Sequence, residues 1–355
     1  MCPPPGGPLR CGPGGQPQQR TSGARQCLGG AFAVCVPWAT AAKLLGWSWG
    51  GVVRPRAVWC WVHAAGHHAL EPLQEELAAG ARGHVPPREP LAADLAAWPL
   101  ALGADGVMVP LRPVAGAPTG KTRWRESNVG VRAHVGQHRT RLGHVVTGLQ
   151  QRRRVAVLGD IEARTPRLWG EAGRQGILQA PQVVWLREGG RGVWRLVAQR
   201  VAGHATGIVD LSHAAQQLWK GAAAWWDGRT TQARRWCVWA RHRLRHGMPD
   251  GVLADLTDAM AVEGLPATAR DTVRTVYASL ERHREPIDSA MYKALGLPLG
   301  SGMVASACTW LIQQRCKGVG MRWSEDGFNH LLHLRLAWVN GRFEALFGLT
   351  LSPNP

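Results

Sequence analysis

The sequence predicts an α/β fold that is followed by a long helical stretch. Strand-like and helix-like segments alternate between residues 102 and 225, as in a sheet flanked by helices. No alternating strand occurs between residues 214 and 295, where Gly and Pro residues divide helices of ordinary length. The chain has 355 residues and is 45% hydrophobic, so it can bury one large core or two smaller ones.

The N-terminal part precedes the α/β pattern. Residues 1–57 are predicted to be a low-complexity or disordered segment, because the first 30 residues are rich in Pro, Gly, Gln and Arg. Residues 58–97 are predicted to be a helical lead-in and a Pro-rich linker, with a helix over 68–81.

Residues 98–213 are predicted to form the first part of the core. Its first strand lies in LALGADGVMVPLRP and carries Asp105, a residue type that is rarely buried unless it is paired or bound to a metal. Residues 129–135 alternate as a strand does, and further strands are predicted over 145–149 and 152–160.

A helix is predicted next, over residues 162–178. The run PQVVWL (181–186) is continuously apolar, which is typical of a strand buried on both faces, and Glu188 follows it. A helix over 192–201 and a short strand over 207–210 complete this part.

Residues 296–347 are predicted to be C-terminal core helices, ahead of a tail at 348–355. A Gly/Pro turn leads into a run from Met303 to Arg315 with apolar residues at helical spacing, and a basic last turn with glycine beyond it ends the run. Ser324 is predicted to cap a helix over 325–340.

The composition indicates a polyanionic partner. The formal net charge is +18 at pH 7, which makes nucleic acid the default partner, although a GC-rich coding bias toward Arg would also raise the charge. The basic helices after residue 228 interleave Arg with Trp. They are interpreted either as a DNA-contacting face or as a solvated Arg face over a Trp core.

The cysteines and the hydropathy exclude other classes. The eight Cys form no CxxC pair, so neither a zinc ribbon nor a redox motif is indicated. No apolar run reaches the roughly 18 residues of a membrane helix, and the start has no signal-peptide pattern. The sequence therefore predicts a cytoplasmic protein without a membrane partner.

One string resembles a known family. The stretch from Gly296 to Ser324 resembles the C-terminal signature of bacterial insertion-sequence transposases of the Kra type, which are related to the Mutator-like DDE transposases. That signature reads G-L-P-[IL]-G-S-G-x-V-E-S-A-C-K and then R-x-K-G-x-G-M-R-W-S. The matching residues are Gly296, Pro298, Gly300, Ser301, Gly302, Val304, Ser306, Cys308, Arg315, Lys317, Gly318, Gly320, Met321, Arg322, Trp323 and Ser324.

The resemblance, over about residues 98–347, implies an RNase H-like core with an all-helical insertion at 214–295. It also implies metal-dependent DNA cleavage and strand transfer, with Mg²⁺ or Mn²⁺ as the cofactor. The family's first two catalytic carboxylates fall on Asp105 and Glu188, which are therefore the expected metal ligands. Its Asp-x-x-His feature falls on Asp210 and His213, and its third carboxylate falls on Ala305.

Two of these positions depart from the family. Ala305 offers no ligand, and Glu188 is one methylene longer than the family's Asp, which is harmful where two metals need a fixed separation. This copy is therefore expected to be catalytically impaired. An active protein would need another carboxylate, such as Glu325. Simpler interpretations also remain: Asp105 as a turn residue, Glu188 as a solvated loop carboxylate and His213 as a packing residue.

The expected partner is double-stranded DNA, at element ends and target, in a bacterial cytoplasm near the nucleoid. The resemblance also implies a homo-oligomer in the active state. A non-catalytic DNA-binding remnant, or a basic structural protein unrelated to transposition, are the alternatives. The candidate DNA contacts are Arg123, Arg125, Arg234, Arg235, Arg241, Arg315, Lys317 and Arg322.

Overall fold

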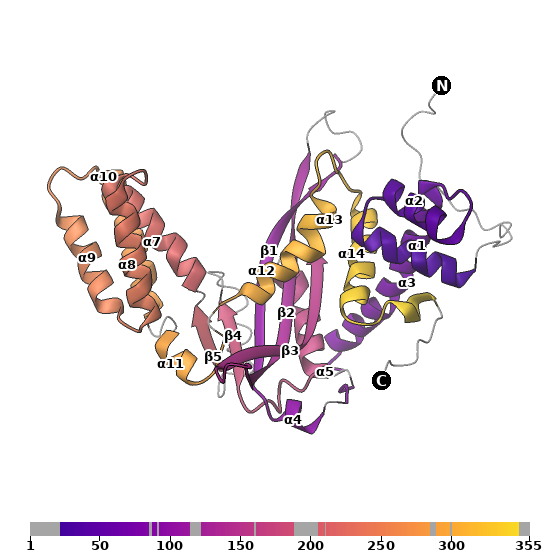
Figure 1. Ribbon diagram of the computed structural model, residues 1–355, viewed down its shortest axis with the longest axis horizontal. Helices are drawn as coiled ribbons and strands as arrows, with labels where there is room; N and C mark the ends of the chain where they lie inside the picture. Colours follow the sequence, from indigo (N-terminus) through magenta and orange to yellow (C-terminus); the bar gives the residue numbers. More distant parts are fainter. Residues whose placement is uncertain are drawn as a thin grey trace.

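The computed structural model describes residues 22–84, 87–90, 92–113, 122–159, 161–187, 205–209, 211–284, 289–298 and 300–347. A central sheet lies between two groups of helices, with α1, α2, α3 and α14 on one side and α7–α10 on the other (Figure 1). The strand order is β3-β2-β1-β4-β5. The prediction of an α/β fold with a mixed sheet flanked by helices is therefore confirmed. No helix in these ranges is long and apolar enough to cross a bilayer.

The sheet has an antiparallel half and a parallel half. The strands β1 (Leu100–Leu111), β2 (Arg123–Arg139) and β3 (Val145–Leu158) pair antiparallel in sequence order. On the other side of β1, β4 (Val183–Arg187) and β5 (Ala205–Val209) are added in parallel. Parallel strands require crossover connections, which is why helix-like sequence separates these strands along the chain.

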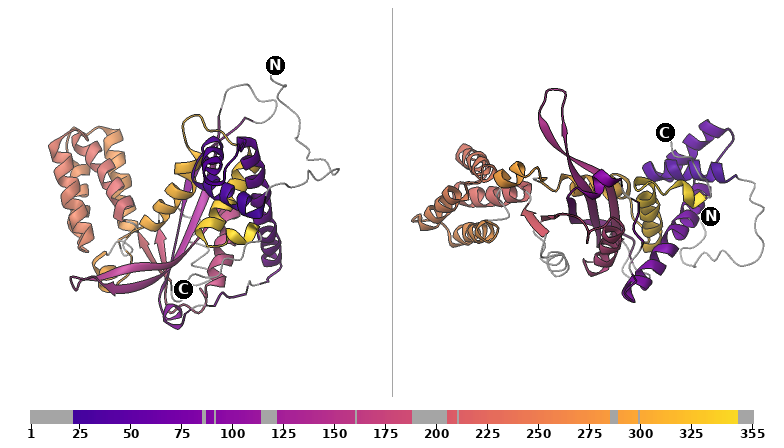
Figure 2. Two further views of the ribbon diagram at one scale, coloured as in Figure 1. Left: turned by 45° about the vertical axis from the view of Figure 1, so that its right-hand side comes forward. Right: turned by 90° about the horizontal axis from the view of Figure 1, so that it is seen from below.

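The third strand was predicted as two strands, over 145–149 and 152–160, and it is one strand with a bulge. Arg132 pairs with Arg153 while His134 pairs with Gln150, so two residues of β3 lie opposite one residue of β2. Gln151, inside this irregularity, has a φ of 45°. A bulge bends its strand and increases the local twist, and the β2–β3 hairpin extends away from the body of the sheet (Figure 2).

The two faces of the sheet are buried in different cores. Along β1, Ala101, Val107 and Val109 point into the larger core, which contains the C-terminal helices. Leu100 and Leu102 point into a smaller core with α5 (Ile161–Arg174). Because side chains alternate between faces with a period of two, a strand covered on both sides reads as the continuous apolar run that the sequence contains.

The prediction of a disordered segment over 1–57 is wrong for residues 22–57. The helices α1 (Gly23–Cys35) and α2 (Trp38–Trp49) precede the long helix α3 (Pro55–Ala81), which starts within the same segment. Small residues such as Ala33 and Ala41 are buried at their contacts, and this small-residue composition conceals the helical pattern in the sequence. A short helix, α4 (Ala93–Ala96), leads into β1.

The C-terminal helices carry the resemblance motif. The helix predicted over 303–315 is observed as α12 (Gly302–Cys308), a π-helical segment (Thr309–Gln313) and α13 (Gln314–Cys316). Ser324 caps α14 (Glu325–Val339) as predicted, since its hydroxyl accepts from the backbone N–H of Gly327 at 3.1 Å. A 3₁₀ turn ends the described chain.

The helical stretch after β5 forms an arm with its own core, joined to the sheet through α11 (Ser289–Ala294). The arm consists of α7 (Leu211–Trp226), α8 (Thr231–Arg245), α9 (Pro249–Ala261) and α10 (Ala267–Arg282). Trp225 and Trp226 stack with ring centroids 3.6 Å apart, and the Trp236 indole N–H donates to Asp255 at 2.7 Å. Trp225, Trp226, Trp236 and Trp239 therefore pack in or against the arm's core, whereas Trp219 is exposed.

A buried histidine makes the stability of the fold depend on pH. Burial lowers the pKa of His333 to about 3, with a further contribution from Arg167. The unfolded chain protonates below about pH 6.5 while the folded chain stays neutral, so stability falls as the pH drops from 6.5 toward 3. We expect a loss of about 1–2 kcal/mol from this residue by pH 5.

Urea unfolding at pH 7 and pH 5 measures this difference for the wild type and for His333→Gln. The variant should be less sensitive to pH, whereas His246→Gln, at an exposed position, should respond like the wild type. Equal pH sensitivity of His333→Gln and wild type would show that His333 is not held neutral.

Candidate functional site

Asp105 lies near the middle of β1, the central strand, with its side chain on the face that α12 crosses. The close approach of helix and strand is set by Gly103, because a Cβ at that position would lie 2.6 Å from Cγ2 of Val304. Two residues further along the same face, Oδ2 of Asp105 lies 3.9 Å from the Cys308 thiol, which donates to it. The backbone N–H of Gly106 donates to Oδ1 at 2.7 Å.

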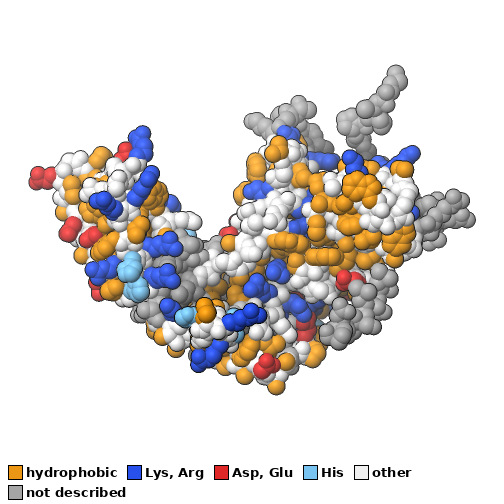
Figure 3. Space-filling model, in the orientation of Figure 1, with side chains coloured by type: hydrophobic (Ala, Val, Ile, Leu, Met, Phe, Trp, Pro, Cys, Tyr) orange, Lys and Arg blue, Asp and Glu red, His pale blue; other side chains and the backbone are white. Residues whose placement is uncertain are grey.

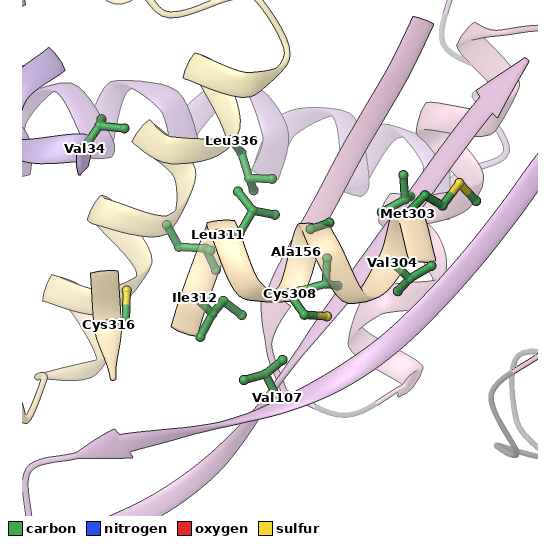
Figure 4. Close-up of a cluster of buried hydrophobic side chains, with 14 of the residues drawn as sticks. Val34, Val107, Ala156, Met303, Val304, Cys308, Leu311, Ile312, Cys316 and Leu336 are labelled. Carbon is green, nitrogen blue, oxygen red and sulfur yellow. The ribbon is translucent and has the colours of Figure 1, made fainter. Parts of the chain in front are cut away.

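The helix α12 brings position 305 to the same region. Ala305 precedes Cys308 by three residues, so the two lie on adjoining parts of one helix face. Figure 4 shows Val304, Cys308 and Ile312 on the side of the helix that faces Val107 of β1. Ala305 itself is exposed. The residues of α12 that contact β1 here are Val304, against Gly103, and Cys308, against Asp105. Position 305 lies beside Val304 on the same helix and has no functional group.

The remaining predicted site residues are described only in part. Glu188 and Asp210 lie outside the described residues, as does the helix predicted over 192–201. His213 lies in α7, and its Nε2 is 3.5 Å from the amide nitrogen of Gln217 one turn later. Among the described residues, no hydrogen bond or ion pair connects His213 with Asp105.

Glu325 is not placed to replace a carboxylate at position 305. One of its oxygens bonds Nη2 of Arg123 and the other bonds Nη1 of Arg125 at 2.9 Å. Arg125 pairs with Val109, four residues from Asp105 along β1, which corresponds to about 13 Å at ~3.3 Å per residue. The two guanidinium groups lower the pKa of Glu325, with the hydrogen bond from Arg125 as the largest cause.

Among the described residues, the groups around Asp105 do not make up the two-metal centre that the resemblance implies. The described neighbours of its carboxylate are a thiol and a backbone N–H, whereas Mg²⁺ prefers several oxygen ligands. Within the described ranges, no group of three or more His, Cys, Asp or Glu side chains could hold a metal. We therefore derive no metal-dependent step from this chain.

Arg315 was predicted to contact DNA, and the structure corrects this prediction. Its side chain is 2% exposed, and its Nε donates to the backbone oxygen of Ala33 at 3.0 Å, near the end of α1. Its guanidinium lies over Trp38 and Trp323, 4.6 and 5.4 Å from the ring centroids. Arg315 thus stabilises the junction of α13 with the N-terminal helices and has no surface for a phosphate.

Two other residues of the motif region, Lys317 and Arg322, form an exposed basic and aromatic surface with Trp124 of β2, which we call the Trp124 surface (Trp124, Lys317 and Arg322). Trp124 is 52% exposed, and Nζ of Lys317 lies 5.8 Å from its ring centroid. The chain after α13 runs along the end of β1, where the N–H of Trp323 donates to the Pro110 oxygen at 3.2 Å. Trp124 pairs with Pro110 on the neighbouring strand, so the three residues lie together.

The other predicted DNA contacts fall into two groups. Arg123 and Arg125 share the carboxylate of Glu325, which offsets one of their two charges, so they are weaker candidates for a phosphate. Arg234, Arg235 and Arg241 are exposed on α8. Figure 3 shows Lys and Arg side chains on both the arm and the core of the face in view, with few acidic side chains among them.

Sequence analysis did not identify Trp124 as a contact residue, although its position between Arg123 and Arg125 was an available signal. The sequence also could not distinguish the buried Arg315 from the exposed Lys317 and Arg322, because all three basic residues occur in one motif. No protein-family model matches the chain, and no curated protein matches it in sequence.

Proposed function

We propose that the chain is a DNA-binding relative of the Kra-type DDE transposases whose cleavage centre is impaired. The observation that carries the proposal is the packing of α12 on β1, in which Cys308 donates to Asp105 and Val304, next to position 305, lies against Gly103. The family motif requires this helix and this strand to meet, and nothing in composition or spacing forces them together. Ala305 and the ion-paired Glu325 support the loss of cleavage.

The proposal includes an RNase H-like core. The order β3-β2-β1-β4-β5, with an antiparallel meander followed by two parallel strands, supports this assignment. The arm follows β5 and precedes α12, which is the position that an insertion between the last core strand and the last core helices would occupy.

The DNA-binding half of the proposal rests on exposed charge and on an exposed ring. The cation of Lys317 against Trp124 leaves both groups facing solvent, and phosphate contacts from Lys and Arg supply most sequence-independent affinity. The exposed Arg residues of α8 add a second basic area. Such contacts are spread over many residues, so DNA binding survives the loss of a metal ligand.

Lys317→Gln and Arg322→Gln test this surface. Each is expected to reduce the slope of log K against log salt by about one, because one phosphate contact is lost. Fluorescence anisotropy with a labelled duplex at several salt concentrations measures the slope. Arg274→Gln is the matched control, since Arg274 already pairs with Asp271 at 2.6 Å. If the salt-dependence slopes of Lys317→Gln and Arg322→Gln equal that of the wild type, the Trp124 surface does not contact DNA.

A comparison of element-end DNA with random duplex separates the two main alternatives. A transposase relative should prefer the ends, whereas a basic structural protein should bind both with the same affinity and the same salt dependence.

A further inference from the structure

A cavity lies between α3, α5, β3 and α14. These elements belong to the antiparallel half of the sheet and the helices next to it, on the side away from the arm (Figure 1). The volume of the cavity is about 260 Å³, just below the ~300–1,000 Å³ of sites for drug-sized ligands. Leu73, Leu77 and Leu336 contribute apolar walls. Arg154, Arg167, Arg174 and Arg342 also line it, so the cavity combines apolar surface with several guanidinium groups.

Part of this charge is neutralised. Arg174 pairs with Glu76 and Glu171, and Arg342 pairs with Glu89 and Glu171. Behind them, Arg153 also pairs with Glu89 and Glu171. The carboxylates of Glu76, Glu89 and Glu171 are therefore already engaged by Arg153, Arg174 and Arg342.

Arg167 has no carboxylate among its described partners. Its Nη1 donates to the backbone oxygen of Ala156 at 3.1 Å and lies 2.9 Å from Nε2 of His333. An arginine only donates, so Nε2 of His333 must accept. The other ring nitrogen, Nδ1, lies 2.8 Å from the Asn329 oxygen and carries the proton. His333 is thus neutral and gives Arg167 no countercharge.

Arg154 is the second guanidinium without a carboxylate. Its Nη1 donates to the Val339 oxygen at 3.4 Å. Its backbone is fixed by Asn340, whose amide bonds both the N–H and the oxygen of Arg154 at 2.9 and 2.8 Å. These two hydrogen bonds hold the end of α14 against the edge strand β3, and they position the Arg154 side chain at the cavity. Burial lowers the pKa of both Arg154 and Arg167.

A further buried cation, Arg132, lies outside the cavity lining, near the Glu171 and Glu89 carboxylates. Arg132 is 0% exposed, and its three guanidinium nitrogens have no hydrogen-bond partner among the described residues. Its strongest favourable electrostatic interaction is with Glu171, which the paired arginines already share. Arg132 therefore draws on the same carboxylates as the paired arginines, which leaves none of them for Arg154 and Arg167.

We propose that the cavity between α3, α5, β3 and α14 binds a small oxyanion carried on a short apolar body, with Arg154 and Arg167 as its ligands. A phosphate or carboxylate group matches the planar fork of a guanidinium, and the leucine walls accept the apolar part. A volume of about 260 Å³ suits a small molecule, whereas a DNA duplex is too wide to enter a space of this size. This site is separate from Asp105 and from the Trp124 surface, so it does not depend on the proposed function.

Calorimetric titration of the full chain with phenyl phosphate and with benzoate tests the proposal at constant ionic strength. At least one of the two should bind, and Arg167→Gln should weaken that binding roughly 10- to 100-fold, the effect of losing a charged hydrogen bond. Arg154→Gln should weaken it in the same direction. Arg234→Gln, an exposed arginine of the arm, should leave it unchanged.

A second variant guards against a folding defect. Ala337→Phe fills the cavity from α14 and leaves every arginine in place, so it should abolish binding while the far-ultraviolet circular dichroism stays that of the wild type. Absence of binding of both probes to the wild type would overturn the proposal. Equal affinity in Arg167→Gln would also overturn it, as would displacement of the probe by a short DNA duplex, which would assign the charge to nucleic acid.

Discussion

Ala305→Glu combined with Glu188→Asp is expected to give a Mg²⁺- or Mn²⁺-dependent nuclease, from a parent that does not cut. The two changes restore the carboxylates that the proposed relationship assigns to positions 188 and 305. The gain should be at least about 100-fold, because even the loss of an outer-sphere partner costs 10- to 100-fold at a metal site. Since position 305 is an exposed helix position and Glu is a good helix former, folding should be unaffected.

The measurement is cleavage of a labelled element-end duplex by the parent, by Ala305→Glu and by the double variant. Adding Asp105→Asn to the double variant should abolish cleavage again. Glu325→Gln in the same background should not, because Glu325 is held by Arg123 and Arg125. If the parent cuts as fast as the variants, position 305 is not the lost ligand and the proposed site is wrong.

Gly66→Ala is expected to destabilise the protein by about 1–3 kcal/mol, the usual cost of overpacking. Gly66 lies in α3 where this helix crosses α14, and a Cβ there would lie 2.4 Å from the backbone oxygen of His330 and 2.6 Å from its Cα. Backbone atoms cannot turn aside as the end of a side chain can, so the two helices would have to separate. The N-terminal helices would lose their packing on the core.

Gly80→Ala in the same helix is the matched control. Nothing lies within 4 Å of a Cβ at Gly80, so only helix propensity acts, and this variant should gain about 0.5–1 kcal/mol. Denaturant midpoints of the two variants should therefore shift in opposite directions. If Gly66→Ala were as stable as Gly80→Ala, α3 and α14 would not pack as closely as described.

The sequence predicted the strand around Asp105, the apolar strand before Glu188, the helical arm and the Ser324 cap. Each of these follows from local chemistry: alternation or continuity of apolar residues, helix breakers, or one hydroxyl ahead of a helix. It was wrong about residues 22–57, because buried Ala and Gly at helix contacts look like low complexity when the neighbouring helices are not known.

The sequence by itself determined which functional groups position 305 and its motif can offer: an alanine cannot bind a metal in any fold. Only the tertiary structure decided how the rest of the motif is used. Arg315 and Lys317 are two residues apart in one basic turn, yet one is enclosed between Trp38 and Trp323 and the other lies over Trp124 in solvent. Burial and charge pairing depend on side chains that are distant along the chain. Glu325 is therefore the partner of Arg123 and Arg125. Arg154 and Arg167 line one cavity, and neither has a carboxylate among its described partners.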